Sequence, residues 1–231
     1  MRNSRMKRAD VLAGAVYSLF NARQRILDGC CLLEAKSASG AAMMAILARE
    51  ELGRHGLLLK HAVRMNGDDV ISAAQLNDEC SDHVRKLKLG QTSVQIPLPP
   101  ELLDRFKELC STPGMSEKDG VMDAISKLAR CKRKRDPDDA HLLRLRSQYV
   151  NARDDGGWDR PDTITMKEAA ALLHTVSADY GNHNIAFWNA PTAKDAIPEA
   201  SMLYNYNDVM DRVIAAISAV HTDGTVSEGA A

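Results

Sequence analysis

The sequence predicts an all-α fold, an antiparallel helical bundle with additional C-terminal helices. Apolar residues recur at helical spacing over residues 40–63 without a proline, and a second long stretch with the same period covers residues 5–37. Short turns separate these stretches, which is typical of antiparallel neighbours in a bundle. Residues 92–96 are the only short segment with strand character, so we expect helices and little sheet.

The helix expected over residues 40–63 is the centre of this bundle. One stripe on a 3.6-residue period carries small and aliphatic side chains, namely Ala41, Ala45, Ala48, Leu52, Gly56, Leu59 and Val63. The first half is apolar on its other faces too, which predicts burial between neighbouring helices. Four charged residues then interrupt the apolar run: Arg49, Glu50, Glu51 and Arg54.

These mid-helix charges allow two interpretations. Glu50 and Arg54 are spaced i,i+4, and so are Glu51 and His55. Such pairs stabilise an exposed helix face by about 0.2–0.5 kcal/mol each. Alternatively, Glu51 and His55 face a polar cleft between helices, where bundle proteins build their sites. Periodicity alone leaves both interpretations open.

Turn and capping signals predict the remaining elements. A turn at residues 66–69 opens a third helix that runs to about residue 88, and three prolines make residues 91–100 a loop. Further helices are expected over residues 100–110, 116–133, 138–150, 165–180 and 195–220. We expect a packed loop at residues 181–191 and a disordered tail at residues 221–231.

Composition is that of an ordinary globular protein. The chain has 231 residues, of which 45% are hydrophobic, so residues 1–220 can form a single helical domain with a sizeable core. The 30 basic and 31 acidic residues leave a net charge of −1, which gives no global sign of nucleic-acid or membrane binding. No segment reaches the roughly 18 uninterrupted apolar residues of a membrane span.

Cysteine usage and local motifs argue against metal and cofactor chemistry. The five cysteines lack a C-x-x-C spacing and are Cys30, Cys31, Cys80, Cys110 and Cys131. They predict reduced thiols in a cytoplasmic protein and no zinc site. No Walker-type loop, G-x-S-x-G or H-E-x-x-H motif occurs. We therefore expect neither a metal nor another cofactor.

Three stretches of the chain resemble a known family. They are Ala-Arg-Glu-Glu-Leu-Gly at residues 48–53, Asp-His-Val-Arg-Lys-Leu-Lys-Leu-Gly at residues 82–90, and a longer pattern at residues 146–169. The last combines Arg146, Tyr149-Val150, Gly157-Trp158, Pro161, Ile164-Thr165 and Glu168-Ala169. In order and spacing they are similar to the AbiV-type abortive infection proteins of the HEPN-like helical superfamily.

This resemblance implies a HEPN-like bundle, usually a homodimer, that defends against bacteriophage by shutting down host processes such as translation. A phage-encoded activator protein and RNA are the partners it suggests. Many HEPN domains are metal-independent ribonucleases with an Arg and a His four to six residues apart. The chain has three such pairs, Arg49 with His55, Arg54 with His61 and Arg135 with His141. About 1.6 pairs are expected at random, so this spacing alone does not identify a ribonuclease.

The candidate catalytic residues are Glu51, His83, Arg146, His55 and Arg49. His83 and Lys86 lie three residues apart, hence on one helical face, where an imidazole and an ammonium can grip a phosphate together. Glu51 would orient the imidazole. The alternative for His83 and Lys86 is a solvated basic helix end.

Further candidates for RNA or phosphate binding are Lys86, Tyr149, Arg133 and Arg135. The two arginines belong to residues 130–135, where five of six residues are basic. Such a run can bind a nucleic-acid backbone, or it can be a solvated helix end. Tyr149 can equally be a packed side chain with a buried hydroxyl partner.

Two functions therefore stay open. The first is a growth-inhibiting effector that cuts RNA, and the second is a non-catalytic helical module that binds a phage or ribosomal protein. The helices at residues 11–33 and 41–63 carry more apolar side chains than one bundle face can use. We expect part of that surface to be shared with a second copy in a two-fold homodimer.

Overall fold

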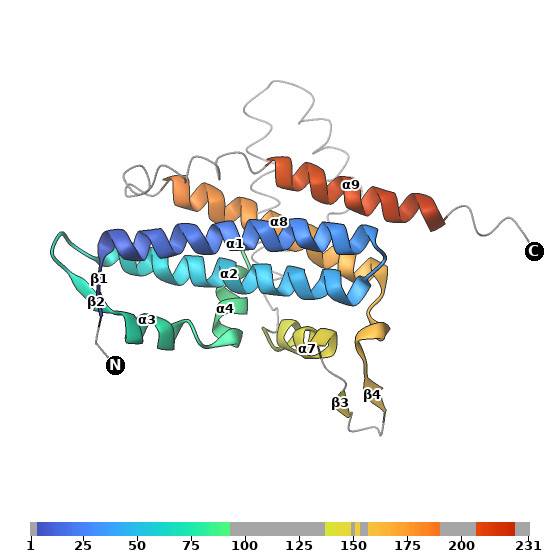
Figure 1. Cartoon of the computed structure of the whole chain (residues 1–231), viewed down its shortest axis with the longest axis horizontal. Helices are drawn as coiled ribbons and strands as arrows, with labels where there is room; N and C mark the ends of the chain where they lie inside the picture. Colours follow the sequence, from blue (N-terminus) through green and yellow to red (C-terminus); the bar gives the residue numbers. More distant parts are fainter. Residues whose placement is uncertain (1–3, 93–136, 149–150, 153–156, 190–206, 225–231) are drawn as a thin grey trace, which may run out of the picture. The chain divides into compact units, whose positions relative to one another are not determined.

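The computed structural model of this protein describes residues 4–92, 137–148, 151–152, 157–189 and 207–224 (Figure 1). The chain divides into two units, residues 1–93 with 137–231 and residues 94–136, and everything described belongs to the first. The helices predicted at residues 100–110 and 116–133 therefore lie outside the described residues. A single domain over residues 1–220 stays a prediction.

Helices dominate the described part, which confirms the all-α prediction. They are α1 (Arg8–Glu34), α2 (Ala38–Arg64), α3 (Ala73–Glu79), α4 (His83–Gly90), α7 (Pro137–Gln148), α8 (Met166–Asn189) and α9 (Asn207–Gly224), with the 3-10 turn η1 (Pro161–Thr163). Two small antiparallel ribbons join them, β1 (Arg5–Lys7) with β2 (Val70–Ser72), and β3 (Asn151–Ala152) with β4 (Trp158–Asp159).

The helices α1 and α2 form an antiparallel hairpin and lie side by side (Figure 1). A three-residue turn connects them, in which Lys36 has a left-handed φ of 59°. Backbone hydrogen bonds from residues 35–37 to the carbonyls of Cys31, Leu33 and Leu32 close the end of α1. Besides α1, α2 contacts α4, α7 and α8, so it is the central helix that the sequence predicted.

Two clusters of buried apolar side chains make up the core. The larger one joins α1, α2, α8 and α9 and includes Leu19, Ile26, Leu52, Tyr180 and Phe187. The smaller one joins the start of α1, the end of α2 and α3, and consists of Val11, Leu12, Ala15, Leu58, Ala62 and Leu76. The polar contacts described below lie where other helices cross the middle of α2.

The prediction of one continuous third helix was wrong, because two local signals divide that segment. Residues 70–72 pair with residues 5–7 as β1 and β2, which shortens the predicted first helix at its start. Asp82 then accepts a hydrogen bond from the backbone N–H of Arg85 at 3.0 Å and so caps a new helix, α4. The segment is therefore β2, α3 and α4 in sequence.

The expected loop at residues 181–191 was also wrong over its described part, because α8 continues to Asn189. Tyr180, His183, Asn184 and Phe187 are buried there at helical spacing, and this packing outweighs the turn-forming composition. Residues 221–224 likewise belong to α9 rather than to a disordered tail. Among the described helices, none is long and apolar enough to cross a membrane.

Three of the five cysteines lie in the described part of the chain, and the reduced state of all five stays a prediction. Cys30, Cys31 and Cys80 are free thiols. Cys110 and Cys131 lie outside the described residues.

The crossing of α2 and α4 depends on two glycines. A Cβ atom added at Gly53 would lie 2.0 Å from the carbonyl oxygen of Lys86, and one added at Gly90 would lie 2.0 Å from that of Arg49. The two helices therefore touch backbone to backbone. Real Cβ atoms do not approach other atoms this closely, so a side chain at either position would push α4 away from α2.

We predict that Gly53→Ala destabilises the protein although Gly53 lies inside a helix. Alanine has the better helix propensity by about 1 kcal/mol. The clash with the Lys86 backbone should reverse that gain and cost a net 1–3 kcal/mol or so. Urea unfolding measures the change. Gly67→Ala is the control, because a Cβ at Gly67 meets nothing within 4 Å. Equal stabilities of Gly53→Ala and the unmodified protein would contradict the close crossing.

Candidate functional site

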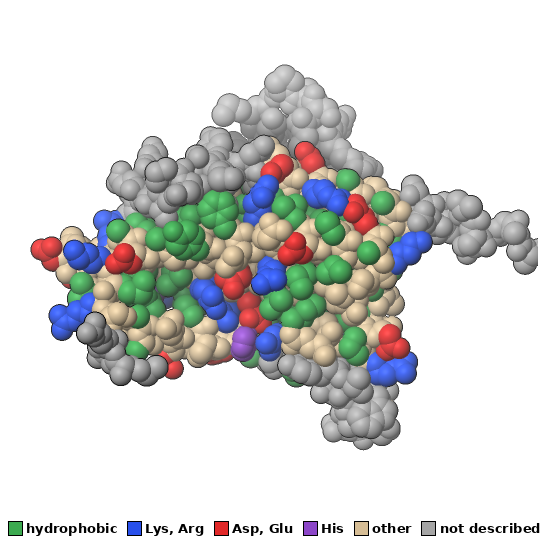
Figure 2. Space-filling view, viewed as in Figure 1, with side chains coloured by type: hydrophobic (Ala, Val, Ile, Leu, Met, Phe, Trp, Pro, Cys, Tyr) green, Lys and Arg blue, Asp and Glu red, His purple; other side chains and the backbone are tan. Residues whose placement is uncertain are grey.

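The buried carboxylate of Glu50, in the middle of α2, contacts three basic side chains. Its Oε2 lies 2.7 Å from Nδ1 of His83 and 3.5 Å from Nζ of Lys86, both on α4. Its Oε1 lies 3.0 Å from Nε of Arg144 on α7. We call Glu50, His83, Lys86 and Arg144 the Glu50 cluster. Figure 2 shows basic, acidic and histidine side chains gathered between apolar ones on one face of the molecule.

The cluster offsets the cost of burying a charge. The Glu50 side chain is only 6% exposed, and an isolated carboxylate at such a depth costs several kcal/mol in lost hydration. The Lys86 and Arg144 side chains are also largely buried, at 5% and 17% exposure. His83 differs from them, because 44% of its side chain reaches solvent. It is therefore the member that can meet a ligand.

The contact with Glu50 fixes which nitrogen of His83 carries the proton. An ionised carboxylate can only accept hydrogen bonds, so Nδ1 of His83 donates to Glu50. In the neutral ring, Nε2 then keeps its lone pair. A histidine held this way by a carboxylate, with the other nitrogen open to solvent, can accept and return a proton.

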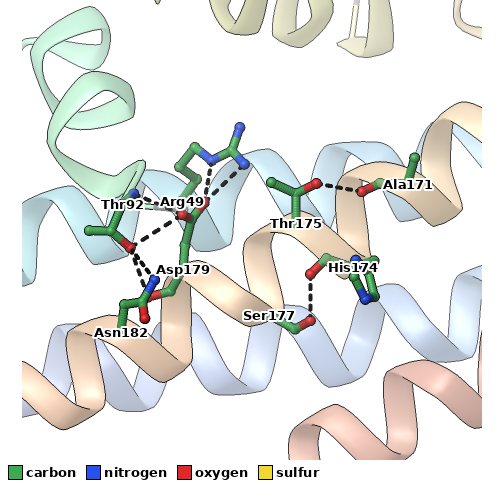
Figure 3. A network of polar contacts seen from close by, with 8 residues as sticks. All are labelled: Arg49, Thr92, Ala171, His174, Thr175, Ser177, Asp179 and Asn182. Carbon is green, nitrogen blue, oxygen red and sulfur yellow. Dashed lines mark hydrogen bonds and ion pairs between the residues drawn. The ribbon is translucent and has the colours of Figure 1, made fainter. Parts of the chain in front are cut away.

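A second buried network is built around Asp179 of α8 and lies close to the end of α4 (Figure 3). Arg49 donates to Oδ2 of Asp179 from Nε at 3.1 Å, and its Nη2 lies 3.0 Å from the same oxygen. The backbone N–H of Thr92 donates to Oδ1 of Asp179 at 2.8 Å. Asn182 donates from Nδ2 to the hydroxyl of Thr92 at 3.2 Å. Arg49 is thus engaged in the interior, whereas the sequence made it a candidate catalytic residue.

His55 is fully buried between α1 and α8. Its Nδ1 lies 3.0 Å from the carbonyl oxygen of Ala15. Its ring packs edge-on against His183 at 5.4 Å and Phe187 at 5.9 Å between ring centroids. Burial, and to a smaller extent the neighbouring His183, lower the pKa of His55 to about 4. The ring is therefore neutral near pH 7 and belongs to the core rather than to a polar cleft.

Three of the candidate catalytic residues, Glu51, His83 and Arg146, have separate partners. Glu51 lies 3.6 Å from Arg54 on its own helix, and Arg146 pairs with Glu168 at 3.0 Å. Glu50, the residue before Glu51, lies next to His83, and Arg144 rather than Arg146 contacts Glu50. Successive residues of a helix point about 100° apart, so a shift of one position selects a different face.

The other predicted site residues divide into three groups. Lys86 lies in the Glu50 cluster, as its spacing from His83 suggested. Arg54 and His61 form another of the Arg–His pairs found in the sequence. Arg54 contacts Glu51, and Nε2 of His61 lies 3.1 Å from Oε2 of Glu79, so the two members of this pair have different partners. Tyr149, Arg133 and Arg135 lie outside the described residues. Within the described ranges, no group of three or more His, Cys, Asp or Glu residues could hold a metal ion.

Sequence reasoning missed Glu50 and Arg144 as members of the site. Glu50 was visible as half of an acidic doublet, and its 33-residue separation from His83 hides their contact. Arg144 was visible only as an arginine two residues before Arg146. The signal that was available is the glycine one turn after Glu50 and the glycine one turn after Lys86, which permit the two helices to meet.

Helical fold and sequence together define the class of protein. The described part of the chain consists mainly of helices, and the sequence model of the HEPN family AbiV matches residues 10–181. The chain therefore belongs to the AbiV family, a group of abortive-infection proteins that act in defence against bacteriophage. The match includes every residue of the Glu50 cluster. No curated protein and no solved structure matches the chain.

We predict that His55 makes the stability of the protein fall in acid. The pKa of His55 is about 4 in the folded protein and about 6.5 when unfolded. Between about pH 6.5 and pH 4 the unfolded chain therefore binds a proton at His55 that the folded chain does not bind. The free energy of unfolding falls as the pH is lowered through this range. From pH 7 to pH 4.5, His55 should lower the free energy of unfolding by about 2–3 kcal/mol.

Urea unfolding at both pH values, with and without His55→Gln, measures this contribution. The pH dependence should shrink by that amount in His55→Gln, because the titrating ring is gone. It should persist in His174→Gln, since His174 is exposed on α8. The same pH dependence in all three proteins would contradict a buried neutral His55.

Proposed function

We propose that the protein is a phage-defence effector that arrests growth or translation by cutting RNA without a metal ion, with His83 as the proton-transfer residue. One observation carries this proposal. His83 is held at 2.7 Å by the buried carboxylate of Glu50 and is still 44% exposed. Membership of the AbiV family supports the defence role.

The chemistry required is transfer of a phosphate to the neighbouring 2′-hydroxyl of RNA. A bond forms between the 2′-oxygen and phosphorus, and the bond from phosphorus to the 5′-oxygen breaks. Nε2 of His83 accepts the proton of the 2′-hydroxyl, and Glu50 stabilises the imidazolium that results. Lys86 and Arg144 are largely buried beside Glu50, so their positive charges would oppose the negative charge on the phosphate oxygens from a distance and not by direct contact.

The departing 5′-oxygen needs a proton, and His83 of a second copy would supply it in a homodimer. The apolar excess of α1 and α2 is the reason to propose this dimer. Tyr17 on α1 and Ile214 on α9 are exposed by 59% and 52%, which agrees with an apolar surface left over after the described helices have packed. To bring two histidines to one phosphate, the two-fold axis has to pass beside α4, which carries His83, so the dimer surface would also have to include α4.

The burial of the cluster favours a second candidate function. Glu50 joins α2 to α4 and α7 through side chains that are mostly buried, as a purely structural ion network would be. In that case the protein is a non-catalytic module, and growth stops because it binds a phage or ribosomal protein. A phage-encoded activator is a proposed partner in both cases.

We predict that His83→Ala abolishes growth inhibition without unfolding the protein. The exposed ring contributes little packing, so the melting temperature should stay within a few degrees. RNA cleavage should fall by roughly 10²–10⁴-fold, the usual contribution of a general acid–base group. The measurement is expression in growing cells, together with incubation of purified protein with total RNA and tRNA in a metal chelator. His174→Ala, on an exposed histidine of α8, is the matched control.

The same experiment separates the two candidates. If the unmodified protein cuts RNA in chelator and His83→Ala does not, cleavage is the activity. If RNA stays intact while His83→Ala still abolishes growth inhibition, the protein acts by binding. Full growth inhibition by a folded His83→Ala would remove the Glu50 cluster from both accounts.

A further inference from the structure

The position of α4 matters because this helix carries His83 and Lys86, and α4 is too short to be stable by itself. It has eight residues, and isolated helices of that length are not stable in water. Its apolar packing is slight, since Leu87 is buried but Leu89 is 42% exposed. Polar contacts at the two ends of α4 therefore have a large share in deciding where His83 lies.

The start of α4 is held by Glu50, and the chain that leaves its far end is held by Asp179. Thr92 follows α4 by two residues, and its backbone N–H donates to Oδ1 of Asp179 at 2.8 Å. The hydroxyl of Thr92 lies 3.3 Å from the same oxygen. Asp179 belongs to α8 and its side chain is fully buried. The two ends of α4 are thus tied to two different helices, α2 and α8.

Two adjacent residues of α2 serve these two ends. The Arg49 guanidinium binds Oδ2 of Asp179 through Nε at 3.1 Å and Nη2 at 3.0 Å, while Thr92 binds Oδ1. The next residue, Glu50, binds His83 at 2.7 Å. Figure 3 shows the Asp179 carboxylate between Arg49 and Thr92. Charge-assisted hydrogen bonds are strong and directional, so Arg49 holds this carboxylate in the orientation that Thr92 needs.

The close contact of α2 and α4 does not fix α4 by itself. Gly90 touches the backbone of Arg49, and Gly53 touches that of Lys86. Such van der Waals contacts limit how near the helices come, but each of them is weak. A hydrogen bond has a preferred direction. The bond from Thr92 to Asp179 therefore resists sliding of α4 along α2 and rotation of α4 about its own axis.

We infer that Asp179 is a positioning residue for His83, which acts through the backbone N–H of Thr92 and through α4. By holding the end of α4, Asp179 keeps Nδ1 of His83 within reach of the Glu50 carboxylate. A misplacement of about 1 Å in a reacting group can lower a rate by about 10²-fold. The effect on the place of His83 is independent of any reaction, whereas the effect on RNA cleavage rests on the proposed function.

The alternative role of Asp179 is to neutralise the buried charge of Arg49 and nothing more. Asp179→Ala cannot separate the two roles, because loss of one member of a buried ion pair destabilises the whole protein. Thr92→Pro does separate them. Proline has no backbone N–H, so the bond to Asp179 is lost while Arg49 and Asp179 both remain. Gln91 is extended, with φ −87° and ψ 104°, as the residue before a proline prefers.

The tautomer of His83 provides the direct readout. Long-range ¹H–¹⁵N spectra of the histidine rings are recorded for the full-length protein and its variants, below their melting temperatures and at a pH where His83 is neutral. In Thr92→Pro the Nδ1-protonated fraction of His83 should fall by roughly half or more, because the tautomer depends on the bond that Nδ1 makes. In Thr92→Val that fraction should equal the fraction in the unmodified protein, since valine keeps the N–H and removes the hydroxyl alone.

A second variant covers the case in which proline disturbs the fold. The double change Arg49→Met with Asp179→Leu removes the acceptor of Thr92 and leaves no buried charge without a partner. Exchange of a buried ion pair for apolar side chains of similar volume is often neutral or stabilising. The Nδ1-protonated fraction of His83 should fall in this variant as it does in Thr92→Pro.

RNA cleavage measures the consequence for the proposed reaction. Per folded molecule, Thr92→Pro should cut total RNA about 10–10²-fold more slowly than Thr92→Val. An unchanged tautomer of His83 in folded Thr92→Pro, or in the double variant, overturns the inference. If the tautomer changes but cleavage is absent or equal in the two Thr92 variants, Asp179 positions His83 as inferred and the ribonuclease proposal fails. The two failures are therefore distinguishable.

Discussion

The backbone contact between α2 and α4 is the constraint on which the candidate site depends. Gly53 and Gly90 have no Cβ atom, so a carbonyl oxygen of the other helix lies where a Cβ atom would clash. At that distance Glu50 reaches His83 and Lys86 directly, and α7 adds Arg144 from another side. With α4 further away, the carboxylate would stay buried without its partners, which is the costly state. The glycines therefore determine both the packing and the chemistry.

Two adjacent charges in the middle of α2 explain how this helix can be central and still carry polar groups. Arg49 points to Asp179 on α8, and Glu50 points to α4 and α7. Each charge is neutralised by a different neighbour, so α2 is held on two sides by ion pairs and along α1 by apolar packing. Among the four members of the Glu50 cluster, His83 is the most exposed, with 44% of its side chain in solvent. The site is thus an exposed histidine on a rigid, charge-compensated support.

The sequence predicted the helices of this structure better than it predicted the residues of the candidate site. The period of residues 40–63 located α2 within two residues at each end, because a buried helix needs that pattern. The break before α4 and the continuation of α8 to Asn189 were missed, since the first depends on the cap formed by Asp82 and the second on packing around Phe187. The resemblance pointed to residues 48–53 and 82–90, the stretches that contribute Glu50, His83 and Lys86 to the Glu50 cluster. It could not decide between Glu50 and Glu51, because that choice depends on how closely α4 approaches.

The tautomer of His83 is the most direct test of the claim that Nδ1 of His83 donates a hydrogen bond to the Glu50 carboxylate. The measurement is a long-range ¹H–¹⁵N correlation spectrum of the histidine rings at a pH where His83 is neutral, recorded for the unmodified protein and for Glu50→Gln. A carboxylate that accepts from Nδ1 requires the proton on Nδ1, whereas a free histidine in water favours Nε2. We expect the Nδ1-protonated form for His83 and a shift toward the Nε2-protonated form in Glu50→Gln. An Nε2-protonated His83 in the unmodified protein, unchanged by Glu50→Gln, would contradict the account.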